Sequence, residues 1–313
     1  MRNRPGGETS WPRPFPEPSG WNRAHGGSLR RVRRSPVFVA TTIILALVVL
    51  AVTLWTQLEQ RFIFFPTHDI VSTPDQVGLT YEDVYFTTSD GFRLHAWYVP
   101  GTTDVTWLWF HGNGGNLSHR VDDLALFHHR LGMNQLIIDY RGYGRSEGRP
   151  SEQGTYRDAR AALLYLQGRP DVMPDRIVYF GRSLGTAVAV ELAVDHPPLA
   201  LVLVSPFASL SDMAHFAFPR LPAGWLVRNK YNSLARVAKV QRPLLILHGD
   251  QDETVPISQG EKLFRAANQP KRFQLLSGAG HNDPLGGGGT ELWDALEEFM
   301  AEFTAGEAGV ESD

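Results

Sequence analysis

The chain of 313 residues contains no cysteine. This absence excludes a disulfide framework, a thiolate metal site and a cysteine nucleophile. The histidines show no HExxH spacing, and no glycine-rich loop is followed by the Gly-Lys-Ser/Thr of a phosphate-binding loop. We therefore expect no metal and no cofactor, and any chemistry must come from the side chains.

Positive charge exceeds negative charge at the N-terminal end of the chain, and the reverse holds for the rest. The first 35 residues carry a net charge of +6, whereas the whole chain carries −3, so the remainder stands at −9. An acidic domain is a poor match for a phosphate backbone. We therefore expect no nucleic-acid partner.

A single long apolar run, Val37–Trp55, contains no charged residue and is long enough to cross a bilayer as a helix. Arginines crowd the segment before it, which predicts a cytoplasmic N-terminus and an extracytoplasmic domain. A cleaved signal peptide is the alternative, but the run is long for one and no A-x-A site follows, which favours an uncleaved signal-anchor. We expect a disordered basic tail over residues 1–35 and a transmembrane anchor over 36–58.

Beyond the anchor, apolar strands and helical segments alternate, which predicts an α/β domain with a mostly parallel sheet covered by helices on both faces. This domain is expected over residues 59–303, with a flexible C-terminal tail over 304–313. Asp90-Gly91 between two alternating runs predicts a hairpin. The eight expected strands are Tyr81–Thr87, Arg93–Val99, Val105–Phe110, Gln135–Asp139, Arg176–Phe180, Ala200–Val204, Leu244–Leu247 and Phe273–Leu276. The expected helices are Ser118–Leu131, Gln153–Gln167, Leu184–Asp195, Ser258–Ala267 and Glu291–Phe303.

The most informative motif is the G-x-S-x-G segment Gly181–Gly185, which lies between an apolar strand and an alanine-rich helix. A sharp strand-to-helix turn of this kind is the nucleophile elbow, and it predicts Ser183 as a nucleophile. The N–H of Leu184 then lies at a helix N-terminus, where it can stabilise an oxyanion.

Partners for such a serine follow in the order acid, then histidine. His281 comes directly after the last expected strand, where it can serve as the base. The acid is open at this point, because Asp250, Asp252 and Glu253 share one loop. Upstream, the glycine-rich turn after the third strand predicts the N–H of Asn113 as the second oxyanion donor. Neighbouring His111 is expected to be structural.

The order of these motifs resembles the α/β-hydrolase superfamily, and more narrowly its membrane-anchored branch of serine hydrolases. That branch acts on acyl esters and thioesters and includes protein depalmitoylases of animals. The resemblance covers roughly Arg61 to Phe303. The blocks that carry it are His111–Gly115, Asp139–Ser146, Gly181–Gly185, Ser205–Phe207, His248–Asp252 and Gly280–Asp283.

The resemblance implies an α/β-hydrolase fold with the nucleophile at Ser183, the base at His281 and the acid at Asp252. The oxyanion donors fall on Asn113 and Leu184. A serine rather than an aspartate nucleophile excludes dehalogenase and epoxide-hydrolase chemistry.

Three further features of the sequence concern the surroundings of this site. We expect Asp139 to tie down its own loop, with Arg141 as its partner. Residues 283–289 are glycine-rich, which predicts a mobile pocket wall. The segment 205–239 is short for a cap and predicts either helices that complete the core or an apolar rim for an acyl chain.

The sequence thus predicts a membrane-anchored serine hydrolase that cleaves acyl ester or thioester bonds through an acyl-enzyme. The expected partners are a small-molecule or lipid-like acyl substrate and the membrane. Carboxylesterase, thioesterase, lipase and peptidase activities share these residues. A catalytically idle binding or scaffold protein of the same fold stays as an alternative.

Overall fold

The computed structural model describes residues 35–220, 223–282 and 289–304. The expected tails, 1–35 and 304–313, lie outside the described residues except for their inner ends. Most of the glycine-rich loop 283–289 also lies outside them. The chain divides into two compact units, Met1–Ala51 and Val52–Asp313.

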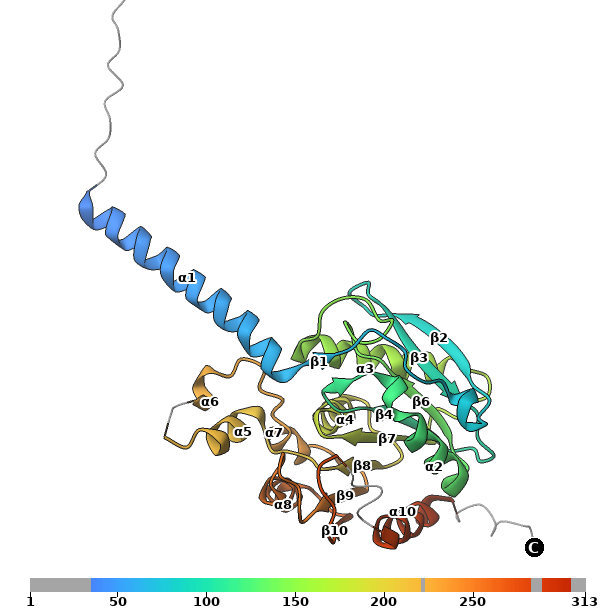
Figure 1. The fold of residues 1–313 in the computed structure, drawn as a ribbon. Helices are drawn as coiled ribbons and strands as arrows, with labels where there is room; N and C mark the ends of the chain where they lie inside the picture. Colours follow the sequence, from blue (N-terminus) through green and yellow to red (C-terminus); the bar gives the residue numbers. More distant parts are fainter. Residues whose placement is uncertain (1–34, 221–222, 283–288, 305–313) are drawn as a thin grey trace, which may run out of the picture. The chain divides into compact units, whose positions relative to one another are not determined.

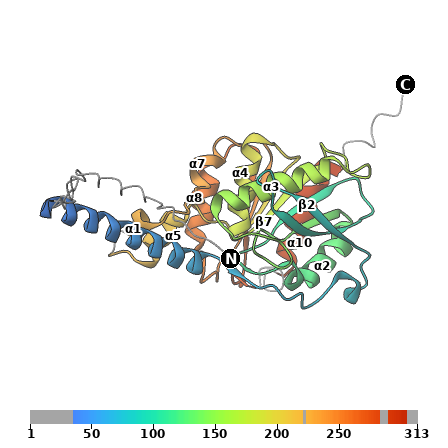
Figure 2. The same ribbon diagram turned by 90° about the horizontal axis from the view of Figure 1, so that it is seen from above.

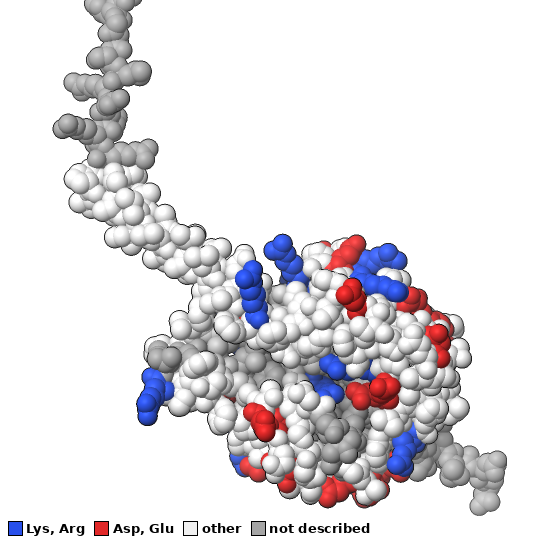
Figure 3. Space-filling model, viewed as in Figure 1, with Lys and Arg blue, Asp and Glu red and all other residues white. Residues whose placement is uncertain are grey.

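The apolar run forms one helix, α1 (Pro36–Ile63), which is long and apolar enough to cross a membrane. It carries no charged residue before Glu59, and its space-filling surface lacks charged side chains over most of its length (Figure 3). The helix does not stop at residue 58. Its last turns, from Val52 onward, are part of the second unit.

The second unit is built on an eight-stranded sheet with the order β10-β9-β8-β7-β4-β6-β3-β2 (Figure 1). Only β3 pairs antiparallel with its two neighbours, and the other pairs in this sheet are parallel. The strands are β2 (Glu82–Thr87), β3 (Arg93–Val99), β4 (Thr106–Phe110), β6 (Asn134–Ile138), β7 (Ile177–Arg182), β8 (Leu201–Val204), β9 (Leu244–Gly249) and β10 (Lys271–Leu276). A separate parallel pair joins β1 (Phe65–Pro66) to β5 (Gly114–Gly115).

All eight expected strands are present, each within a few residues of its expected bounds. The predicted hairpin joins β2 to β3, with Thr87 opposite Arg93. Gly91 at its turn has a φ of 89°, a conformation that glycine adopts without a steric penalty.

Helices cover both faces of the sheet, as Figure 2 shows. The layer with α3, α4 and α8 packs on one face, and α2 and α10 pack on the other. The residues of β4 alternate between the layers: Leu108 and Phe110 face the first, and Trp107 and Trp109 face the second. The helices are α2 (Val121–Leu131), α3 (Glu152–Gln167), α4 (Leu184–Asp195), α8 (Ile257–Ala266) and α10 (Gly289–Thr304).

The segment between β8 and β9 holds three short helices, α5 (Leu210–Ala217), α6 (Ala223–Leu226) and α7 (Leu234–Val237). The helices of this segment differ in what they contact. α7 completes the core, because Val237 is buried there. α5 has no fully buried residue and lines two cavities instead.

The packing of α2 on the sheet depends on one aromatic side chain, Phe127. Its ring lies 5.0 Å from that of Trp107, 5.2 Å from that of Trp109 and 5.1 Å from that of Phe180, between centroids. Such aromatic pairs add to the free energy gained from burial.

We expect Phe127→Ala to lower the free energy of unfolding by about 3–5 kcal/mol, because a 2% exposed ring is replaced by a cavity. The neighbouring Leu126 on the same helix is 45% exposed, so Leu126→Ala should change it by less than about 0.5 kcal/mol. Urea denaturation of the full-length protein in detergent, followed by tryptophan fluorescence, measures both. Equal losses would contradict the assignment of Phe127 to the core.

Candidate active site

Ser183 lies at the turn between β7 and α4, with φ 51° and ψ −117°. A non-glycine residue in this region carries about 1–3 kcal/mol of strain. The flanking glycines permit it: a Cβ on Gly185 would lie 1.9 Å from the carbonyl oxygen of Phe110, and one on Gly181 would lie 2.6 Å from that of Gly185. The turn is thus a close three-way approach of β7, α4 and β4.

His281 and Asp252 form a series of hydrogen bonds with this serine. His281 Nε2 is 3.1 Å from Ser183 Oγ, and His281 Nδ1 is 2.8 Å from Asp252 Oδ2. The carboxylate at Nδ1 fixes the tautomer in which Nδ1 donates a proton and Nε2 accepts one. Of the three residues that the sequence predicts for a triad, Ser183 and Asp252 therefore each lie within hydrogen-bonding distance of His281.

Asp252 is buried, and its other oxygen, Oδ1, accepts hydrogen bonds from the N–H groups of Thr254 (3.0 Å) and Val255 (2.7 Å). Burial by itself raises the pKa of Asp252, but the hydrogen bonds from His281 and the Val255 amide outweigh it, so the pKa lies below its usual value. The group is therefore a carboxylate at neutral pH.

The other acids of this loop point elsewhere. Asp250 is exposed, and its Oδ1 accepts a hydrogen bond from the N–H of Gly278 at 2.7 Å. Glu253 is exposed as well. Of the three candidates in the loop, Asp252 is the one that contacts His281.

Asn113 and Leu184, the expected oxyanion donors, line a cavity of about 170 Å³ together with Ser183. The loop that carries Asn113 is tied down on several sides. The carbonyl of Asn113 accepts hydrogen bonds from the Phe65 N–H (3.0 Å) and the Tyr143 hydroxyl (2.8 Å), and its side-chain amide donates to Ile63 O (2.9 Å).

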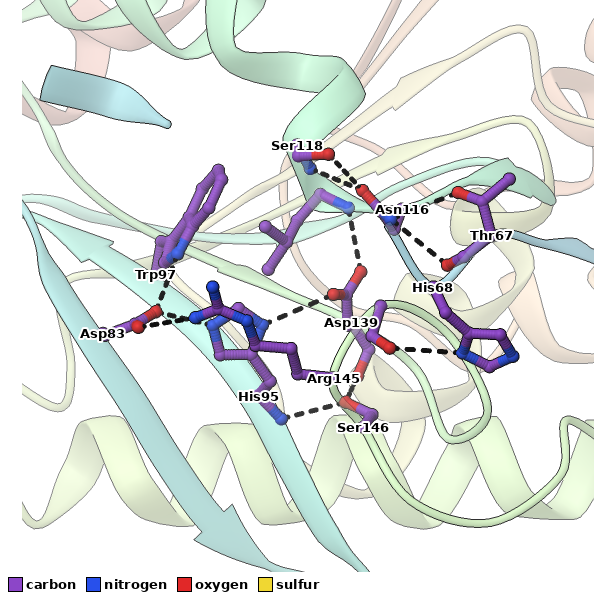
Figure 4. Close-up of polar contacts among 12 residues, drawn as sticks. Thr67, His68, Asp83, His95, Trp97, Asn116, Ser118, Asp139, Arg145 and Ser146 are labelled. Atoms are coloured by element: carbon purple, nitrogen blue, oxygen red, sulfur yellow. Dashed lines mark hydrogen bonds and ion pairs between the residues drawn. The ribbon is translucent and has the colours of Figure 1, made fainter. Parts of the chain in front are cut away.

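Asp139, directly after β6, also holds the loop that follows β4. Its Oδ1 accepts the N–H of Leu117 at 2.8 Å, and the imidazoles of His95 and His111 lie 3.5 and 3.6 Å from its carboxylate. Figure 4 shows His95 between Asp139 and Asp83, and Asp83 also accepts a hydrogen bond from Trp97. Asp139 thus ties down the loop after β4 rather than its own.

The prediction that Arg141 pairs with Asp139 is wrong. The guanidinium of Arg141 instead forms ion pairs of 2.8 Å with Asp158 of α3 and with Asp90 of the β2–β3 turn.

Asp139 is buried among imidazoles: burial raises its pKa, but the nearby His111 and His95 outweigh this and hold the pKa below its usual value.

A larger cavity of about 650 Å³, with more polar side chains in its lining, also includes Ser183 and His281. Two cationic side chains line it, Arg120 and Arg182. Arg182 Nη2 donates to the carbonyl of His281 at 2.9 Å and so fixes the loop of the histidine. Sequence reasoning missed Arg182 and Tyr143, although both stand inside motifs that it identified.

Among the residues that the structure describes, no group of histidines and acids has the arrangement of a metal site.

Comparisons with known proteins converge on one superfamily. A model of the prolyl oligopeptidase family matches residues 121–306. An uncharacterized protein of Mycobacterium tuberculosis is 43% identical over 278 residues, which span 88% of this chain and 98% of that protein. The α/β-hydrolase domain-containing protein WAV2 of Arabidopsis thaliana is 35% identical over 82% of this chain and 92% of its own length.

Among solved structures, an esterase of Pyrococcus furiosus superposes with a TM-score of 0.67. It shares 21% sequence identity, and the match covers 77% of this chain and 98% of the esterase. At that identity the likeness establishes the α/β-hydrolase fold.

We expect Asp139→Asn to lower the free energy of unfolding by about 1–3 kcal/mol at pH 7, because a buried group loses its charge-assisted hydrogen bonds. A carboxyl whose pKa is lowered by folding stabilises the protein above its ordinary pKa of about 3.9, and this contribution is lost as the pH falls through the lower folded value. The gap between wild type and variant should therefore shrink as the pH falls below about 4.

Chemical denaturation across this pH range measures the gap. Asp175→Asn serves as the control, because Asp175 is exposed and should show no such gap at any pH. A gap that stays constant down to the lowest accessible pH would contradict the role of the Asp139 charge.

Proposed function

Because this chain is a hydrolase of the prolyl oligopeptidase family, within the α/β-hydrolase superfamily, we propose that it is a serine hydrolase that cleaves acyl ester or thioester bonds. The observation that carries the proposal is the line of hydrogen bonds from Ser183 through His281 to Asp252. An intact line of this kind, on a strained turn beside a cavity, also speaks against an idle scaffold.

In the proposed reaction, Ser183 Oγ attacks the substrate carbonyl while its proton passes to His281 Nε2. Asp252 stabilises the imidazolium that forms. The N–H groups of Asn113 and Leu184 stabilise the negative oxygen of the tetrahedral intermediate. The intermediate collapses to an acyl-enzyme as His281 gives its proton to the leaving alcohol or thiol. Water, deprotonated by His281, then releases the acid and regenerates Ser183.

We further propose that α1 is an uncleaved membrane anchor, with the N-terminus in the cytoplasm and the catalytic domain outside it. Support comes from the uncharged length of the helix and from the arginines that precede it. A site tethered to a bilayer is close to lipid-like acyl substrates.

We expect Ser183→Ala and His281→Ala to fold normally but to lose at least about 10⁴-fold in kcat/KM on a p-nitrophenyl ester. Labelling by a fluorophosphonate probe should occur in the wild type and disappear in Ser183→Ala. Persistent turnover in either folded variant would remove that residue from the mechanism. An unlabelled, well-folded wild type would favour the idle binding protein.

The acid is tested by a matched pair of variants in one loop. Asp252→Asn should lower kcat by about 10⁴-fold, because the histidine loses the partner that fixes its tautomer. Asp250→Asn should retain most of the activity, since Asp250 holds only the Gly278 turn. The reverse ranking, measured on the same ester, would reject Asp252 as the acid.

A further inference from the structure

Two cavities adjoin each other on the apolar side of Ser183. The smaller, of about 170 Å³, contains Ser183 and Leu184 in its lining. The larger, of about 410 Å³, is lined by the last turns of α1, by α5 and by the residues around Leu226. Both are lined by the same four apolar side chains: Phe62, Ile63, Leu210 and Met213. Together the two cavities form a path that leads from Ser183 to the space between α1 and α5.

The α1 wall of this path is fixed to the domain by hydrogen bonds. Trp55 Nε1 donates to the carbonyl of Leu226 at 2.8 Å. The buried Glu59 accepts the N–H groups of Arg228 (2.7 Å) and Asn229 (2.9 Å) through Oε1. At the inner end, Ile63 O accepts the side-chain amide of Asn113. The wall is therefore tied to the oxyanion loop at one end and to the segment after α6 at the other.

The lining indicates what occupies the path. Glu59 is the one ionisable residue among the described lining of the larger cavity, and two backbone N–H groups occupy its Oε1. The other lining residues are apolar, including Ala214, Ala217 and Phe218. Near the outer end, Trp225 is 90% exposed. A hydrocarbon chain gains free energy along such a surface, whereas a polar group would lose its water there.

We propose that the last turns of α1 and helix α5 form the binding path for a long acyl chain of the substrate, so that the helix expected to anchor the protein also selects its substrate. The proposal rests on the proposed function of Ser183, whose acyl group would extend into this path. Each methylene that the path buries should raise kcat/KM about fourfold, which corresponds to about 0.8 kcal/mol.

The first experiment compares esters of two to sixteen acyl carbons on the full-length protein in detergent. Each ester is kept below its own critical micelle concentration. Wild type should prefer chains of ten or more carbons over acetyl by at least 100-fold in kcat/KM. Ala214→Trp fills the larger cavity but not the smaller, so it should cost at least tenfold on long chains and leave acetyl and butyryl esters unchanged. His215→Trp places the same indole at an exposed neighbour that lines neither cavity, and should leave the whole series unchanged.

A second measurement separates this inference from the proposed function, because it needs no turnover. A photoreactive diazirine analogue of palmitate should crosslink Ser183→Ala protein at the end of α1 and in α5, and excess palmitate should suppress the crosslinks. Ala214→Trp should abolish them in this background, and His215→Trp should not.

Crosslinks without ester turnover by the wild type would reject the proposed function and keep the path. Turnover of short esters with no preference for chain length and no crosslink in α1 or α5 would overturn the path and keep the function. An equal effect of a well-folded Ala214→Trp variant on all chain lengths would also overturn it, since the larger cavity would then not distinguish long acyl chains from short ones.

Discussion

The close approach of α4 to β4 is the constraint on which the site depends. The start of α4 lies so near the carbonyl of Phe110 that no side chain fits at Gly185. This contact, together with the hydrogen bond from the Ser183 N–H to Val204 O, holds Ser183 in its strained conformation. Ser183 then lies above the ends of the strands, within reach of a histidine that follows β10. Loosening the contact would release the strain and move the serine away from its partners.

The loop after β4 couples this turn to distant parts of the chain. Asp139 holds it from β6, Tyr143 bonds to Asn113, and Ile63 and Phe65 bond to Asn113 from the segment that leaves α1. The predicted oxyanion donor is therefore positioned by residues close to the end of the apolar helix. A helix joined by a flexible linker would lack these bonds, so the end of α1 is a structural part of the second unit.

Much of this arrangement could be predicted from the sequence, for a physical reason. The central strands β4, β6, β8 and β9 are buried on both faces and are therefore mostly apolar runs in the sequence. All eight strands were identifiable, and the helix Leu184–Asp195 has its predicted bounds. The residues alone left the acid open, because Asp250 and Asp252 are the same residue type in one loop, and only the resemblance favoured Asp252. In the structure the two differ in which way they point: Asp252 contacts His281, and Asp250 contacts the Gly278 N–H. Arg141 was assigned to a neighbour in sequence, whereas its partner Asp158 lies on α3. Helices α6 and α7 have four residues each, too few to show a helical period, so the number of helices between β8 and β9 was not predictable.

In the proposed reaction, the two cavities lined by Ser183 would give a substrate its orientation. In a tetrahedral intermediate, the acyl group and the leaving group extend in different directions from the carbon that Ser183 attacks. The apolar path between α1 and α5 suits the acyl chain, which leaves the polar cavity with Arg120 and Arg182 for the leaving group. His281 lines that polar cavity and not the apolar one, so in the proposed reaction the proton that it returns would be delivered on the side where the alcohol or thiol departs. The position of the base thus supports the same orientation as the distribution of apolar surface.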